Sequence, residues 1–338
     1  MPTDSDSTPP SGTMHAVEEP IDAPLVRRLL TAQFPHWAHL PLTRFPSSGT
    51  VNAVYRLGDD LAVRLPRVVT SGVEDIEKEQ RWLPRLAPLL PVAVPVVLGK
   101  GVPGEGYPWP WSVHRWLEGD HPDATLLARS DGTGDDARDE VRDDVRDISG
   151  ANIGDSATQL ALDLAEFITA LRRVDPTDAP PAYRGAPLAT EDDGVRAAIR
   201  DLRGDIDTGA ATGAWEAALA APDWSGPPLW LHSDLMPGNL LLSRGRLSGV
   251  IDFETVGVGD PACDLIVAWN PLPARVRHDF RVAVGLDDAT WARGRGWALA
   301  MALIQLPYYR DRNPVIAGHA RHVIREVLTE HRAGDHLS

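Results

Sequence analysis

The strongest pattern in the chain is HSDLMPGN at residues 232–239, which is followed by GVIDF at residues 249–253. Asp234 precedes Asn239 by five positions, and the Pro-Gly pair between them predicts a compact loop. Asp252 stands at the end of an apolar run that is typical of a strand. Oxygen-bearing side chains at strand ends can converge on one hard cation, and Mg²⁺ prefers few protein ligands completed by water and phosphate. An Asp that does not bind the metal can orient a hydroxyl and accept its proton.

Three further motifs extend this pattern along the chain. They are PWPWSVHRWLEG at 108–119, GVGDPACDL at 257–265 and GWALAMALIQLPYYRDRNP at 296–314. Together with the Asp-x₄-Asn loop and the later Ile-Asp-Phe, their order and spacing resemble the aminoglycoside phosphotransferase family, which has a protein-kinase-like fold. The resemblance spans residues 22–330, apart from an acidic insertion at 129–157.

The resemblance implies a role for each residue that matches the family's motifs. Asp234 would be the catalytic base or orienter for an acceptor hydroxyl, while Asn239 and Asp252 would hold Mg²⁺ against the phosphates of the nucleotide. Asp264 would be buried and would brace the backbone of the catalytic loop. His232 would pack beneath that loop rather than take part in the chemistry.

The first third of the chain is expected to supply the nucleotide site. Ser48, Gly49 and Thr50 lie where a loop that covers phosphate is expected, just before a predicted strand. Small residues there would let backbone N–H groups approach phosphate. A Ser/Gly turn before a strand is more often only a turn, so this prediction rests on the position of the loop.

The cation that pairs the α- and β-phosphates is expected on the strand LAVRL, where this sequence has Arg64 instead of the usual Lys. Lys78 and Lys100, the only lysines, lie elsewhere. Arginine keeps the charge and can bind phosphate in a bidentate manner, although its geometry differs from that of an ammonium group. Glu79 is the predicted partner of Arg64, with Glu74 and Glu77 as alternatives.

Arg115, Trp116 and Leu117 would form the hinge at which the base of the nucleotide bonds to backbone groups. Trp109 and Trp111, together with Trp116, are predicted to be core aromatics rather than a shelf on which the base stacks.

The pattern of elements predicts an α+β, bilobal, protein-kinase-like fold with a small antiparallel β-sheet lobe and a larger, mainly helical lobe. The predicted organisation is a disordered tail over 1–20, a nucleotide-binding lobe over 21–114, and a catalytic and acceptor-binding lobe over 115–338, interrupted by the acidic insertion 129–157. Helices are expected over 22–34, 73–90, 158–173 and 190–220, the last of them interrupted by glycines, and strands over 51–57, 61–65, 92–98 and 111–117.

Composition narrows the class of protein further. The 338 residues carry a formal charge of −15, and 43% of them are apolar. This length suggests two domains. The negative charge argues against a nucleic-acid partner, and Cys263, as the only cysteine, excludes an intrachain disulfide. With no apolar run long enough to span a bilayer and no secretory signal, we expect a cytoplasmic protein without a membrane partner.

We therefore predict a Mg²⁺-dependent enzyme that transfers the γ-phosphate of ATP or GTP to a hydroxyl of a small molecule, with a cationic molecule among the candidates. Only eight residues separate Asp252 from Pro261, and Ser233 replaces the usual Arg after the catalytic-loop His. Both features argue against a polypeptide acceptor and a phosphorylation switch.

The resemblance makes an antibiotic the first expectation for the acceptor, and an aminoglycoside the first among antibiotics, serving resistance or self-protection. Nucleoside, macrolide and peptide antibiotics and primary metabolites are alternatives. Carboxylates that could meet an ammonium-bearing acceptor are Asp193, Asp201, Asp205, Glu254 and Asp311. A non-catalytic nucleotide-binding protein and, less favoured, a metal-dependent hydrolase are the other classes considered.

Overall fold

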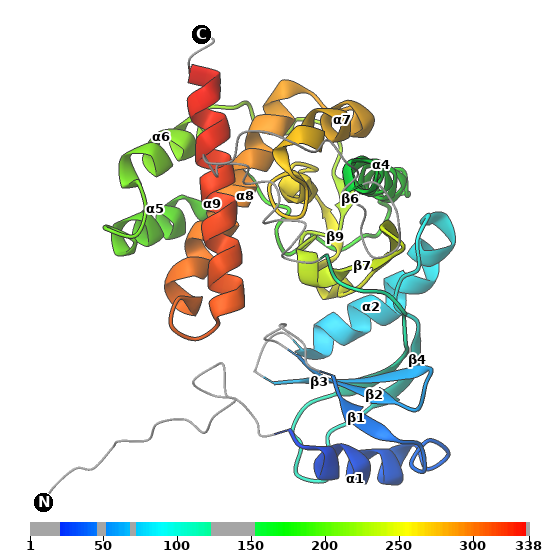
Figure 1. Cartoon of the computed structure of the whole chain (residues 1–338). Helices are drawn as coiled ribbons and strands as arrows, with labels where there is room; N and C mark the ends of the chain where they lie inside the picture. The colour runs from blue at the N-terminus through cyan, green and yellow to red at the C-terminus, as the bar shows by residue number, and fades with distance from the viewer. Residues whose placement is uncertain (1–20, 46–51, 68–71, 123–152, 336–338) are drawn as a thin grey trace, which may run out of the picture. The chain divides into compact units, whose positions relative to one another are not determined.

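The computed structural model describes residues 21–45, 52–67, 72–122 and 153–335 (Figure 1). The predicted tail, the predicted phosphate loop and most of the acidic insertion lie outside the described residues. The chain forms two compact units, one made of Met1–Gln80 and Val96–Trp116 and the other of Arg81–Pro95 and Leu117–Ser338. The predicted lobes differ from these units mainly in residues 81–95, which the structure groups with the second unit.

The first unit is built on a five-stranded antiparallel sheet with the strand order β1-β2-β3-β5-β4 (Figure 1). Its strands are β1 (Leu42–Arg44), β2 (Asn52–Leu57), β3 (Leu61–Pro66), β4 (Val97–Gly101) and β5 (Trp111–Arg115), and its helices are α1 (Ala23–Gln33) and the first part of α2 (Gly72–Leu86).

The β2–β3 hairpin forms where the sequence predicts it. Gly58 takes a left-handed φ of 61° in the turn, a conformation that glycine adopts without a Cβ penalty. Alternate residues of both strands point into a buried core, with Tyr55 and Val63 paired across the hairpin. This period of two is the reason that the short apolar runs become strands rather than helices.

The second unit is mainly helical, and it also holds two small two-stranded sheets, β6–β9 and β7–β8. Its helices are α4 (Ile153–Arg172), α5 (Asp192–Asp201), α6 (Thr208–Leu219), α7 (Ala274–Val284), α8 (Asp288–Tyr309) and α9 (Pro314–Asp335). Its strands are β6 (Leu229–Leu231), β7 (Leu240–Ser243), β8 (Arg246–Val250) and β9 (Gly257–Gly259). Short 3₁₀ turns lie at η1 (Ala87–Leu89), η2 (Leu188–Glu191), η3 (Pro237–Asn239), η4 (Phe253–Thr255) and η5 (Cys263–Ala268). Together the units confirm the predicted α+β, kinase-like class.

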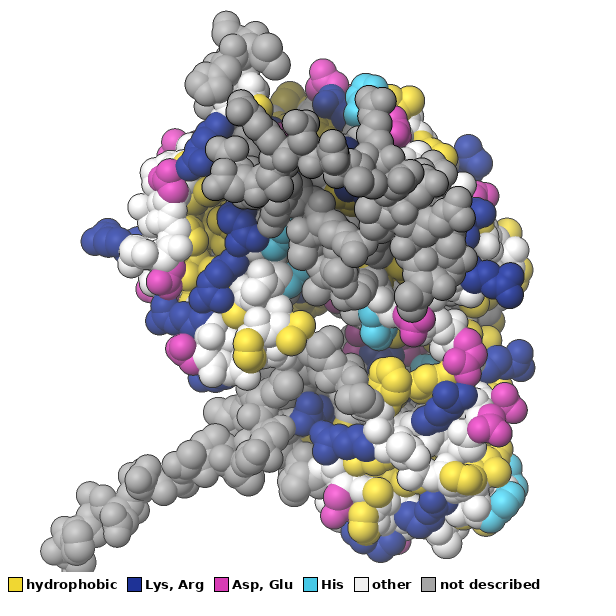
Figure 2. Space-filling view, viewed as in Figure 1, with side chains coloured by type: hydrophobic (Ala, Val, Ile, Leu, Met, Phe, Trp, Pro, Cys, Tyr) yellow, Lys and Arg dark blue, Asp and Glu magenta, His cyan; other side chains and the backbone are white. Residues whose placement is uncertain are grey.

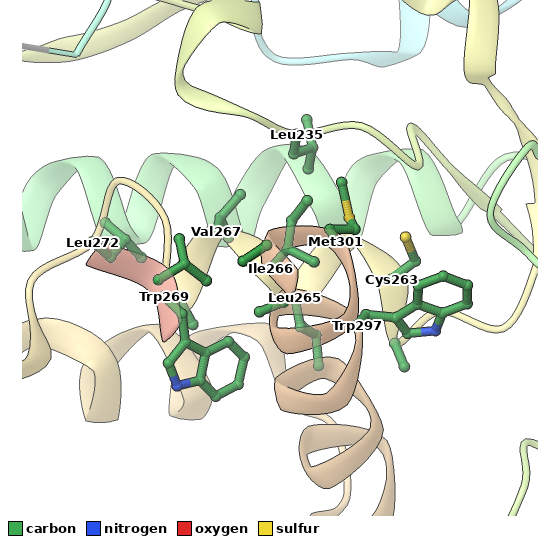
Figure 3. Close-up of a cluster of buried hydrophobic side chains, with 14 of the residues drawn as sticks. Leu235, Cys263, Leu265, Ile266, Val267, Trp269, Leu272, Trp297 and Met301 are labelled. Carbon is green, nitrogen blue, oxygen red and sulfur yellow. The ribbon is translucent and has the colours of Figure 1, made fainter. Parts of the chain in front are cut away.

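Helix α8 runs through the core of the second unit, beside α9 (Figure 1). Gly294 and Gly296 allow this close packing, because a Cβ at Gly294 would lie 2.7 Å from the Leu265 side chain, and one at Gly296 would lie 2.6 Å from that of Leu188. Every residue of η5 is buried, and Figure 3 shows its side chains between α8 and Leu235 of the HSDLMPGN loop. The loop therefore rests on a solid apolar layer.

One predicted element was wrong in extent. The strand expected over 92–98 begins only at Val97, since Pro95 has no N–H to donate to a ladder. Ala93 instead donates to the Ser248 carbonyl and accepts from Val250, both within the second unit. The glycine-interrupted helical region expected over 190–220 forms as α5 and α6, and Gly204, whose φ is 96°, lies in the break between them.

Within the described part of the chain, no helix combines the length and apolarity needed to cross a membrane.

Asp163 ties helix α4 to the β7–β8 hairpin. Its carboxylate accepts hydrogen bonds from Arg246 Nε and Nη2, both at 2.8 Å, from Gln159 Nε2 at 3.0 Å and from the Leu247 N–H at 3.1 Å. Burial raises the pKa of the Asp163 carboxyl, but these hydrogen bonds and the Arg246 charge outweigh it, so that the pKa lies below its ordinary value.

We expect Asp163→Asn to lower the free energy of unfolding by about 1–2 kcal/mol at neutral pH, because it removes a charge-assisted anchor whose arginine is half exposed. A lowered pKa in the folded state means that this contribution is full above the ordinary pKa and is lost as the pH falls through the folded value. Denaturant unfolding measured against pH tests this. Asp223→Asn, at an exposed carboxylate, is the matched control, and equal midpoints for the two variants would refute the anchor.

Candidate active site

The HSDLMPGN loop is held by the carboxylate of Asp264. Its Oδ2 accepts from the His232 N–H at 2.9 Å, and its Oδ1 accepts from the Ser233 N–H at 2.8 Å. Asp264 is 1% exposed. Burial raises the pKa of its carboxyl, against the lowering effects of His232, of the two backbone N–H groups and of Arg172. This is the bracing contact that the resemblance implied.

The backbone of the loop is strained at Ser233, whose φ is 64° although it is not glycine. Hydrogen bonds to the segment after Asp252 hold it there. Ser233 Oγ donates to the Thr255 carbonyl, and Thr255 Oγ1 donates to the His232 carbonyl, each at 2.8 Å. Asp252 has a left-handed φ of 68° as well, so the two segments that carry the predicted site both depend on the surrounding structure for their conformation.

His232 is fully buried beneath the loop. Its Nε2 lies 3.0 Å from the Ile251 carbonyl, which can only accept, so this nitrogen carries the proton. Its Nδ1 accepts from the Asp234 N–H at 3.3 Å, and its ring packs edge-on against Phe253. These contacts agree with the packing role predicted for His232.

Two donors fix the carboxylate of Asp234. Asn239 Nδ2 donates to its Oδ2 at 2.9 Å, and Arg184 Nη1 donates to its Oδ1 at 3.0 Å. The Asp–Asn contact is within the loop, as the five-residue spacing indicates. Arg184 was missed at the sequence level, because no motif marks it and it lies fifty positions before Asp234.

The amide of Asn239 is oriented by its neighbours. Nδ2 also donates to the Asp234 carbonyl at 2.8 Å, so both of its contacts are acceptors and the Oδ1 end of the amide is turned away from them. The Asn239 carbonyl accepts from the Ile251 N–H at 2.9 Å, which places Asp252 one residue beyond that link. An amide oxygen and a carboxylate on adjacent segments fit a Mg²⁺ ion that shares its shell with phosphate and water.

Arg64 and Glu79 meet in the first unit. Arg64 Nη1 lies 3.2 Å from Glu79 Oε1 and 3.3 Å from Oε2, and Glu79 is 1% exposed. In the orientation that satisfies its neighbours, the Asn52 amide oxygen accepts from Arg64 Nη2 and Nε. The structure thus brings the predicted pair together, and its role toward a nucleotide stays a prediction.

The predicted hinge residues follow β5. The N–H groups of Arg115 and Trp116 are taken, since they donate to the carbonyls of Val96 at 2.9 Å and Asp60 at 2.7 Å. Of the three predicted residues, Leu117 is therefore the one whose N–H has no backbone partner in the part of the chain that the structure describes.

Two of the three tryptophans near the predicted hinge are core aromatics, as the sequence predicts. Trp111 is fully buried in the core of the first unit, and Trp109 is partly buried against the same core. Trp116 lies outside that core, where it packs edge-on against Phe45 with Arg56 over its ring. Ser48, Gly49 and Thr50 lie outside the described residues.

A narrow recess with no room for a water molecule lies beside the loop in the second unit. It is lined by Met236, Asn270, Ala298, Met301, Ala302, Gln305, His319, Ala320 and Val323. Burial lowers the pKa of His319 to about 4, so its imidazole is neutral and hydrogen-bonds Asn270 at 2.9 Å. With no room for a ligand, the recess is not a candidate acceptor pocket, and none of the residues that line it is acidic.

The chain matches the model of the phosphotransferase enzyme family over residues 43–297, and it belongs to that family. It is a phosphotransferase by this membership. A search of curated proteins finds no match.

Solved structures of similar fold cover nearly the whole chain. The GDP and kanamycin complex of APH(2″)-IIia is 19% identical with a TM-score of 0.67, and the match covers 90% of this chain and 98% of that one. The GDP complex of wild-type aminoglycoside 2′-phosphotransferase-IIIa is 18% identical, with a TM-score of 0.65 and the same coverage. Apo macrolide 2′-phosphotransferase MphH from Brachybacterium faecium is 22% identical, with a TM-score of 0.53, covering 91% and 97%. At these identities the likeness shows the fold.

We expect Asp264→Ala to destabilise the protein, because it leaves the N–H groups of His232 and Ser233 buried without an acceptor, at about 1–3 kcal/mol each. Thermal unfolding of the purified variant measures this. Asp288→Ala, which breaks an exposed pair with Arg281, is the control. A variant as stable as that control would show that Asp264 does not brace the loop.

Proposed function

We propose that this phosphotransferase moves the γ-phosphoryl group of ATP or GTP to a hydroxyl of a small-molecule antibiotic, in a Mg²⁺-dependent reaction. An aminoglycoside is the first candidate acceptor, with macrolide, nucleoside or peptide antibiotics and primary metabolites as alternatives. The observation that carries the proposal is the Asp234 carboxylate, which Asn239 and Arg184 hold in one orientation inside a braced loop.

In the proposed reaction the acceptor hydroxyl oxygen attacks the γ-phosphorus while the bond to the β–γ bridging oxygen breaks. The bridging oxygen keeps the electron pair, and the nucleoside diphosphate departs. Asp234 orients the hydroxyl and takes its proton. Fixing the carboxylate in advance favours this step, because positioning supplies much of the rate in phosphoryl transfer.

Asn239, through Oδ1, and Asp252 are the residues that would hold Mg²⁺. The ion, when bound, offsets negative charge on the nucleotide phosphates. The donor set suits it, since Mg²⁺ accepts few protein oxygens and completes its shell elsewhere. No group of three or more His, Cys, Asp or Glu side chains gathers as a metal cage within the described ranges.

Arg64 is the proposed cation for the α- and β-phosphates, positioned by Glu79. A guanidinium that is 14% exposed and paired with a nearly buried carboxylate loses little freedom on binding phosphate. Ser48, Gly49 and Thr50 are proposed for the phosphate loop, and the backbone of Arg115, Trp116 and Leu117 for the base. Proteins of similar fold have been solved in complex with GDP and with ADP, which supports a nucleotide as co-substrate. Both guanine and adenine nucleotides should therefore be tested.

The short segment after Asp252 supports a small acceptor. Residues 253–259 form η4 and β9, and β9 pairs with β6 along its whole length. Because these residues are used in η4 and β9, the segment has no additional residues with which to bind a peptide.

The charge around the candidate acceptor carboxylates bears on the class of antibiotic. Asp205 and Asp311 share one arginine, Arg310, at 3.4 and 3.6 Å. Figure 2 shows dark-blue basic side chains on the side of the second unit where Figure 1 has α5 and the turn between α8 and α9. Asp205 and Asp311 are therefore partly neutralised, and for this reason a macrolide, which carries fewer ammonium groups than an aminoglycoside, is included in the test as an alternative.

The lobe division at 114/115, the lobe roles, and the cytoplasmic location without nucleic-acid or membrane partners remain part of this proposal.

Incubating the full chain with Mg²⁺, ATP or GTP and a panel of hydroxylated antibiotics and metabolites tests the function. Mass spectrometry should find one acceptor class heavier by a phosphoryl group. Asp234→Asn should reduce turnover about 10²–10⁴-fold with nucleotide binding retained, since it removes the general base. Nucleotide binding without any product would favour a non-catalytic protein, and full turnover by the variant would show that Asp234 is misassigned.

Asp252→Ala should weaken the binding of Mg²⁺ and nucleotide together, because one of two protein ligands is removed. Titration of Mg²⁺ at fixed nucleotide, followed by calorimetry, measures the shift of the midpoint to higher Mg²⁺. Asp223→Ala, at an exposed carboxylate of the same unit, is the control. An unchanged midpoint in Asp252→Ala would mean that the metal is held by other residues.

A further inference from the structure

We propose that Arg184 is a positioning residue for Asp234, held in place by residues 180–185 packed on the two glycines of β9. This inference rests on the proposed function and adds to it a cation that no motif indicates.

The guanidinium of Arg184 contacts the HSDLMPGN loop at two points. Its Nη1 donates both to Asp234 Oδ1 at 3.0 Å and to the Ser233 carbonyl at 3.1 Å. The carboxylate and the backbone of the loop are thereby tied to a single donor. Because Asn239 holds the other carboxylate oxygen, rotation of Asp234 about its last bond would break a hydrogen bond in either direction.

The Arg184–Asp234 pair differs from the structural ion pair in the same unit. Arg293 and Asp260 form a pair at 2.7 Å with side chains 2% and 6% exposed. Arg184 and Asp234 are 21% and 23% exposed, so a substrate can reach them. In the described part of the chain Nε and Nη2 of Arg184 have no hydrogen-bond partner, while Tyr183, largely exposed, packs its ring 4.9 Å from the guanidinium.

Residues 180–185 reach Asp234 because they run along β9. The Val258 N–H donates to the Pro180 carbonyl at 2.8 Å, and the Ala182 N–H donates to the Val258 carbonyl at 3.0 Å. The Asp260 N–H donates to the Gly185 carbonyl at 3.0 Å, just after Arg184. These bonds fix the backbone on both sides of Arg184.

Gly257 and Gly259 make this close approach possible. A Cβ on Gly257 would overlap the backbone of Pro181 and Ala182, and a Cβ on Gly259 would overlap that of Gly185. The GVG sequence therefore has a physical reason that is separate from metal or nucleotide binding: it lets a segment carrying Arg184 lie against β9.

Arg184→Ala and Arg184→Lys test the proposal, with Mg²⁺-dependent hydrolysis of ATP and GTP by water as the reaction, so that no acceptor need be known. We expect kcat of Arg184→Ala to fall about 10–100-fold with KM for the nucleotide changed by about twofold at most, because orientation is lost and binding is not. Added guanidinium ion should restore part of kcat in Arg184→Ala but none in Asp234→Asn. Arg184→Lys, which keeps the charge, should have a kcat between those of the parent protein and Arg184→Ala. Arg332→Ala, at an exposed pair with Asp207, is the control.

Unchanged kcat in Arg184→Ala overturns the proposal, as does a loss that guanidinium fails to restore and that follows a fall in thermal stability. A parent protein that neither hydrolyses nor transfers phosphate from ATP or GTP overturns the proposed function instead, which separates the two failures.

Gly259→Ala supplies an independent arm. It should lower kcat in the parent protein but hardly further in Arg184→Ala, because both changes act through the same contact. Additive losses would show that β9 does not act through Arg184. If Gly259→Ala fails to fold, the Arg184 variants with guanidinium decide the question.

Discussion

The candidate site depends on one buried carboxylate that accepts two consecutive backbone N–H groups. Asp264 turns the backbone at His232 and Ser233 and so sets the direction in which the following Asp234 leaves the loop. Burial works against the charge of Asp264 and raises the pKa of its carboxyl, and His232, the two N–H groups and Arg172 offset only part of this effect. Burial also lowers the pKa of Arg172, to about 10. A charge held in this way is costly to lose, because the N–H groups beside it have no water to turn to.

Around Asp264, the site is assembled from short segments that are joined to one another by hydrogen bonds. Thr255 and Ser233 exchange hydrogen bonds between the loop and the residues after Asp252. The Ile251 N–H joins the end of β8 to Asn239. A loop with a left-handed Ser233 persists only when its neighbours determine its conformation. The same rigidity that holds the strained backbone also fixes the carboxylate that would handle the acceptor hydroxyl.

Part of the candidate site could be predicted from the spacing of residues close together in the sequence. The pairing of Arg64 with Glu79 follows from a strand and the helix after it, and the Asp234–Asn239 contact follows from a five-residue loop with Pro-Gly inside it. The strand predicted over 92–98 was wrong in extent because an apolar run says nothing about which N–H groups are present, and Pro95 has none. The interruption of the helical pattern over 190–220 was predictable from its glycines, although the pattern alone does not tell where between α5 and α6 the break lies.

The sequence by itself determined the α+β class, the family and the loop that carries Asp234 and Asn239, since these depend on residues close together in the chain. The tertiary structure alone decided that Arg184 meets Asp234 and that Leu117, rather than Arg115 or Trp116, keeps a free N–H within the described residues. Contacts across fifty positions depend on which segments pack together, here residues 180–185 on the glycines of β9. The periodicity of apolar residues along one segment carries no information about which distant segment it packs against.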